Sequence, residues 1–78
     1  MKVFIITISF TKPAFKRVKI VKSESAMWRY LHKQQESLTK EEVENGVHVK
    51  VVEAVNDDTR VFKDFSFKIN SKSKIIMW

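Results

Sequence analysis

The side chains with the most binding chemistry in this chain are the cations near its start. The first 23 residues contain six basic residues and no aspartate or glutamate, so they carry +6, the formal net charge of all 78 residues. Ammonium and guanidinium groups can bind phosphates, and an aromatic ring beside them can stack on a base. We therefore expect a contact surface for nucleic acid, or for an acidic protein surface, at the following residues: Lys12, Phe15, Lys16, Arg17, Lys19 and Lys22.

The direction in which these cations point depends on an alternating segment, residues 15–21. Val18 and Ile20 share one face of this predicted strand. Arg17 and Lys19 share the other face. We expect the apolar face to meet the core, which leaves the cations outward, and a one-residue slip in register would exchange the two faces. A solvated surface is the alternative use, because lysines on an exposed strand discourage edge-to-edge association.

A second candidate surface is apolar. Positions 75–78 are four consecutive apolar residues, which one face of a strand cannot all bury. A docked strand that covers the core accounts for part of this run. The docked strand is favoured, and a contact with a partner or a second copy is the alternative, since Met and aromatic residues are enriched at interface anchors. Trp28 lies one position away from the apolar stripe that Met27, Tyr30 and Leu31 form on the predicted helix. The same two alternatives, packing at the core and contact with a partner, apply to it. The candidate interface residues are Trp28, Ile75, Ile76, Met77 and Trp78.

Catalytic and metal-binding patterns are thin. The chain has no Cys, one Gly and two His, and neither His32 nor His48 stands among clustered carboxylates. This composition predicts no disulfide, no metal site, no phosphate-cradling loop and no cofactor. The serines look like caps and turns and have no identifiable base. We expect neither enzymatic activity nor a small-molecule substrate.

The elements that must position these residues follow from local patterns. With 44% apolar residues, the 78-residue chain predicts a single small domain. Residues 3–10 alternate as a strand and form a hairpin with residues 15–21 across a turn at Pro13. Ser23 or Ser25 can cap a helix from about Glu24 to about Glu36.

The second half predicts another hairpin. Residues 38–46 fit either a short helix with a Thr39–Glu42 capping box or an edge strand that turns at Asn45-Gly46, and the helix is favoured. Residues 47–55 and 60–69 follow as paired strands, and residues 74–78 as a short final strand. Phe65, Phe67 and Ile69 of the fourth strand are expected in the core. The fold class is α+β: a small antiparallel sheet of two hairpins with one main helix packed on one face and the other face exposed or covered by a second copy.

These observations predict a small, non-enzymatic, basic binding module that contacts nucleic acid through its first hairpin. The alternative is a protein–protein interaction module, either a homodimer or a small accessory or inhibitor protein, that uses the apolar run at 75–78 and Trp28. No segment approaches the ~20 apolar residues that span a bilayer, and residues 3–10 lack the cleavage site of a signal peptide. We therefore expect a cytoplasmic protein with no membrane partner.

Overall fold

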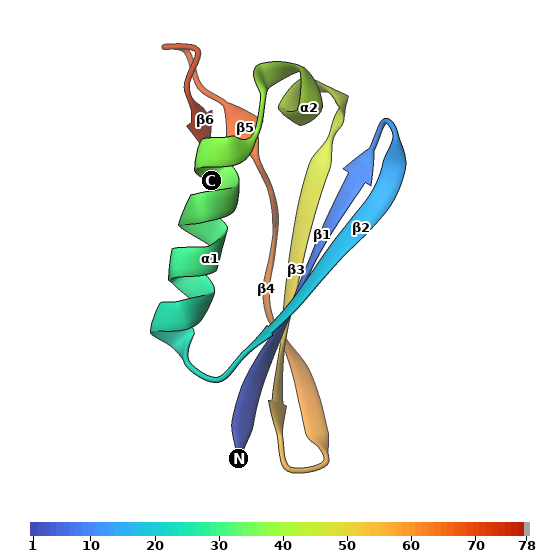
Figure 1. Ribbon diagram of the computed structural model, residues 1–78, viewed down its shortest axis with the longest axis vertical. Coiled ribbons are helices and arrows are strands. Elements are labelled where there is room, and N and C mark those ends of the chain that lie inside the picture. Colours follow the sequence, from blue (N-terminus) through green and yellow to red (C-terminus); the bar gives the residue numbers. More distant parts are fainter. Residues whose placement is uncertain (78) are drawn as a thin grey trace.

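The computed structural model describes residues 1–77 and contains a four-stranded antiparallel sheet with helices on one face (Figure 1). The strand order is β2-β1-β3-β4, so β2 and β4 form the edges. A separate two-stranded sheet pairs β5 with β6. The predicted α+β class with two hairpins is confirmed. The bounds are β1 Lys2–Thr11, β2 Ala14–Val21, α1 Glu24–Ser37, α2 Lys40–Asn45, β3 Val47–Val55, β4 Asp58–Ser66, β5 Lys68–Ile69 and β6 Ile75–Ile76.

Both helices begin at side-chain caps. Ser23 caps α1, and its hydroxyl accepts a hydrogen bond from the backbone N–H of Ala26 at 3.2 Å. Thr39 caps α2 through a complete capping box: its hydroxyl accepts from the Glu42 N–H at 3.1 Å, and the Glu42 carboxylate accepts from the Thr39 N–H at 2.9 Å. The short-helix prediction for residues 38–46 is therefore confirmed, and the edge-strand alternative is wrong.

Gly46 ends α2 in a conformation that other residues rarely adopt. Its φ is +108°, and its N–H donates to the carbonyls of Glu42 and Val43. Its own carbonyl accepts from the backbone N–H and the hydroxyl of Thr11 on β1. A Cβ at position 46 would lie 2.8 Å from the Thr11 hydroxyl oxygen. Any other residue at position 46 would therefore have a strained backbone and a Cβ too close to Thr11.

Gly46→Ala is expected to lower the free energy of unfolding by about 1–3 kcal/mol, the range for a non-glycine residue held in a sparsely populated backbone region. Urea denaturation followed by circular dichroism measures the change. Asn45→Ala, one position earlier and exposed, is the matched control and should stay within about 0.5 kcal/mol of the parent. Equal stability of the two variants would contradict the strained role of Gly46.

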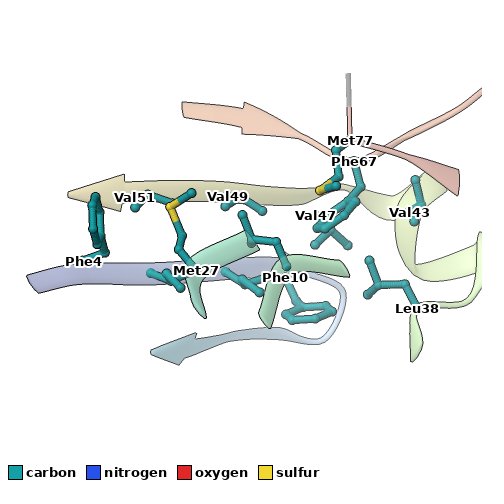
Figure 2. Packing of buried hydrophobic residues seen from close by; sticks show 13 residues of the cluster. Phe4, Phe10, Met27, Leu38, Val43, Val47, Val49, Val51, Phe67 and Met77 are labelled. Atoms are coloured by element: carbon teal, nitrogen blue, oxygen red, sulfur yellow. The ribbon is translucent and has the colours of Figure 1, made fainter. Parts of the chain in front are cut away.

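The core lies between α1 and the central strands. Directly opposed residues of β1 and β3 share the helix-side face, for example Ile6 with Val51 and Ile8 with Val49, and all four are 0% exposed. Met27 and Leu31 of α1 cover them and are also fully buried. Figure 2 shows this cluster, which comprises Phe4, Ile6, Ile8, Phe10, Met27, Leu31, Leu38, Val43, Val47, Val49, Val51, Phe67 and Met77.

The fourth predicted strand, residues 60–69, is divided in the structure. β4 ends at Ser66, and the Phe67 N–H donates to the Val47 carbonyl at 3.0 Å while its ring enters the core at 3% exposure. Phe65 and Ile69 are partly buried against the same cluster. The predicted core position is thus confirmed for Phe67, whereas Phe65 and Ile69 lie at the margin of the core. The chain continues as β5 in the small sheet.

A β-bulge interrupts the pairing of β4 with β3. The register passes from Val51 opposite Lys63 to Val52 opposite Val61, so one extra residue, Phe62, is inserted. Phe62 meets Phe4 edge-on, with ring centroids 5.1 Å apart. The Lys63 ammonium lies 5.7 Å from the Trp28 ring centroid. Trp28 is half-buried and packs against the core cluster.

The prediction that Val18 and Ile20 of β2 meet the core is wrong. The register pairs Arg17 with Ile8 and Lys19 with Ile6, and directly opposed residues of an antiparallel pair share a face. The cations therefore lie on the helix side. Val18 and Ile20 lie on the opposite face, where they are 62% and 61% exposed.

The turn and the aromatic rings explain this choice of face. Thr11 pairs with Ala14 across the turn, which brings Phe10 opposite Phe15. The two rings stack at 4.3 Å between centroids and 5° between planes. Because the turn and the stacked rings set the register of the hairpin, Arg17 and Lys19 of β2 follow the face of Phe10.

The opposite face of the sheet carries an apolar row across all four strands. Ile5 stands opposite Ile20 on one side and Val52 on the other, and Val52 stands opposite Val61. Val61 is 54% exposed. Contact of this face with a second copy of the chain stays a prediction.

Candidate functional site

A groove of about 500 Å³ lies between α1 and the edge strand β2. Both elements contribute side chains, and basic residues are more numerous among them than acidic ones. We call this site the basic groove and define it by its lining residues: Lys19 and Val21 of β2, and Ala26, Arg29, Tyr30, His32, Lys33 and Glu36 of α1.

Helical spacing places one flank of α1 along the groove. Ala26, Arg29, Tyr30 and Lys33 stand at positions i, i+3, i+4 and i+7, which form a single stripe on a helix. Leu31, on the neighbouring stripe, is fully buried and anchors the helix to the sheet. The groove wall therefore sits on a docked, regular element.

Lys19 supplies the facing cation because β2 is an edge strand. It stands opposite the buried Ile6 and shares its face, yet it is exposed. Arg17, two residues earlier on the same face, connects β2 to the helix: its Nη1 donates to the Gln34 side-chain oxygen at 2.7 Å. The Arg17 guanidinium also lies over the Phe10 ring, 4.8 Å from its centroid.

Among residues 1–77, no carboxylate lies within ion-pair distance of the groove cations. Within residues 1–77 the ion pairs are His48–Asp64 and Arg60–Glu53, and both lie on β3 and β4. Glu36 lines the groove but is beyond ion-pair distance of Lys19, Arg29 and Lys33. Uncompensated charges on a concave surface raise the local potential for anions. The groove thus has more positive than negative side chains along its lining, and none of its cations forms an ion pair with a described residue.

The structure brings together only part of the predicted nucleic-acid surface. Lys19 lies in the groove and Arg17 beside it. Phe15 is 38% exposed and stacks on Phe10, so it acts in packing between the two strands. The other three predicted cations lie elsewhere: Lys16 on the opposite sheet face, across from Ser9, Lys12 in the hairpin turn, and Lys22 beyond the end of β2.

Two groove cations, Arg29 and Lys33, are absent from the residues predicted as a binding surface. Their pattern alone indicates an outward-facing helical side. The signal that could have found them is their spacing of four residues beside Ala26 and Tyr30, combined with the register of β2. That register depends on contacts between strands, so neither segment alone indicates that Lys19 lies near Arg29 and Lys33.

The predicted apolar interface residues mostly contact the chain itself. Met77 is 9% exposed within the core cluster, and Ile75 packs against that cluster. The Gln35 side-chain amide donates to the Ile75 carbonyl at 2.6 Å, which ties β6 to α1. Ile76 is half-buried, and Trp78 lies outside the described residues. A partner contact by this segment stays a prediction.

Other polar clusters in residues 1–77 are small. On the uncovered sheet face, His48 hydrogen-bonds Ser66 through Nδ1 at 2.9 Å and pairs with Asp64 through Nε2. On the helix side, the buried Glu53 accepts two hydrogen bonds from Arg60. The described residues hold no group of three or more His, Asp or Glu side chains able to bind a metal. Nor do they include a helix that is both long and apolar enough to span a bilayer.

Comparison with known proteins adds no family. No family model matches this chain, and neither a curated protein nor a solved structure is significantly similar to it.

Proposed function

We propose that this protein binds nucleic acid through the basic groove, holding the phosphodiester backbone with little reading of sequence. The observation that carries the proposal is the convergence of Lys19 from β2 with Arg29 and Lys33 from α1. Each of these cations is exposed and lacks a carboxylate partner among the described residues. Such groups are the usual donors to phosphate oxygens.

The geometry suits a repeating anion. Arg29 and Lys33 are four residues apart on α1, which is about 6 Å along the helix axis. A chain of phosphates can therefore meet both in succession while Lys19 approaches from the facing strand. Arg17 lies two residues before Lys19 on the same face of β2, and its hydrogen bond to Gln34 of α1 holds it beside the groove. It therefore adds a further positive charge next to the groove cations.

Salt dependence tests this function directly. Binding of a fluorescein-labelled, mixed-sequence oligonucleotide is measured by anisotropy, as DNA and as RNA, from about 50 to about 200 mM KCl. Each phosphate neutralised on a single strand contributes about −0.7 to the slope of log K against log salt, so three contacts predict a slope of about −2. Absence of binding at the lowest salt, or an affinity that salt does not change, would refute the proposal.

A further inference from the structure

The basic groove has an apolar surface between its charged edges. Val21, Ala26 and Tyr30 line it together with the cations. Tyr30 is half-buried and packs against the core cluster while it lines the groove. Tyr30 is therefore held in place by the fold and also forms part of the groove surface.

We infer that the groove takes single-stranded nucleic acid and seats one unpaired base against Tyr30, with the flanking phosphates held by Lys19, Arg29 and Lys33. This inference rests on the proposed function and adds the strand state and the base contact. An aromatic ring on a cationic groove is the arrangement by which proteins bind single strands without sequence preference, because every base has a π-face.

Two features favour an unpaired base over a duplex. The open groove of about 500 Å³ has room for a single base beside Tyr30. In a duplex the base faces are covered by stacking, and only backbone and groove edges are available to a protein. A duplex would therefore meet the cations and leave the Tyr30 ring uncontacted.

Tyr30 replaces Phe15 as the stacking ring. The Phe15 ring stacks on Phe10, and the Arg17 guanidinium lies 5.6 Å from its centroid, so intramolecular partners already hold it. Tyr30 instead stands on the same flank of α1 as Arg29 and Lys33, one position from the first and three from the second. Ring and phosphate-binding groups thus share one rigid element.

The test compares two labelled strands of equal length and charge, oligothymidylate and the corresponding abasic deoxyribose-phosphate strand. We expect oligothymidylate to bind roughly tenfold more tightly at the same salt, the scale of stacking one base. Equal affinity with a steep salt dependence would overturn the base contact while leaving the proposed function standing. Loss of binding by both strands would overturn both.

Variants at position 30 assign the effect to the ring. Tyr30→Leu keeps an apolar side chain and should lose roughly tenfold in affinity for oligothymidylate, with no change for the abasic strand. Tyr30→Phe keeps the ring and should match the parent. A Leu variant that binds oligothymidylate like the parent would contradict the assignment.

A spectroscopic measurement on the unaltered protein covers the case in which Tyr30→Leu does not fold. The chain has one tyrosine, so ring-labelled tyrosine gives the NMR signals of Tyr30 alone. Oligothymidylate should shift these signals upfield through base ring currents, and the abasic strand should not. Equal shifts with both strands, or displacement of oligothymidylate by polyglutamate of equal charge and concentration, would refute a nucleobase ligand.

Discussion

Reversal of the three groove cations, by Lys19→Glu, Arg29→Glu and Lys33→Glu together, is expected to weaken nucleic-acid binding at least a hundredfold. A hydrogen bond to a charged group contributes about 1.5–3 kcal/mol, and the variant loses three such contacts while adding repulsion. The salt slope should also fall by about 2, because three neutralised phosphates are lost. Anisotropy titrations at several salt concentrations measure both quantities.

A charge-matched control separates the groove from the overall charge. Lys40→Glu, Lys68→Glu and Lys72→Glu alter exposed cations outside the groove and bring the formal net charge from +6 to 0, as the groove variant does. We expect this control to lose only long-range attraction and to keep most of its salt slope. Similar losses in the two variants would mean that net charge, and not the groove, accounts for binding.

Leu31→Ala should cause the largest loss of stability, about 3 kcal/mol in the free energy of unfolding. Leu31 is 0% exposed, and its removal takes away apolar contact and leaves a cavity between α1 and the sheet. For a domain of this size the melting temperature should fall by roughly 15 °C. Circular dichroism during thermal and urea denaturation measures the change.

The Leu31 variant also links stability to binding. α1 carries Arg29, Tyr30 and Lys33, and its anchors on the sheet include Leu31 and Met27. Loosening the helix should therefore weaken nucleic-acid binding although no groove residue has changed. Leu31→Met, which nearly conserves volume, is the control and should cost less than about 1.5 kcal/mol. Full stability of the Ala variant would contradict the role of α1 as the core's cover.

Most elements of this fold follow from local chemistry. β3 is observed at its predicted bounds, Val47–Val55, because the segment is rich in valine and its first half alternates between apolar and polar residues. α1 is observed at Glu24–Ser37, one residue longer than predicted, because the Ser23 cap fixes its start. The capping box at Thr39 likewise specifies α2. Caps and periodicity act over a turn or a few strand residues, so a short window of sequence contains them.

Contacts distant in sequence set the remaining boundaries. β4 ends before Phe67, whose backbone bonds to Val47 twenty residues earlier while its ring fills the core. At the bulge, the ring of Phe62 contacts Phe4 of β1, and the Lys63 ammonium lies beside the Trp28 ring. No pattern within residues 60–69 indicates either break.

The sequence shows that the first 23 residues carry the net positive charge, but only the tertiary structure determines which cations lie close together. Alternation in β2 is compatible with either face, and stacking of Phe10 on Phe15 turns Lys19 toward the helix. The basic groove forms where the edge strand β2 lies beside one flank of α1. Each element contributes cations, and only the tertiary structure brings them together. Local patterns specify which residues share a face, whereas the register set by the turn and by the Phe10–Phe15 stack decides which face of β2 meets the helix.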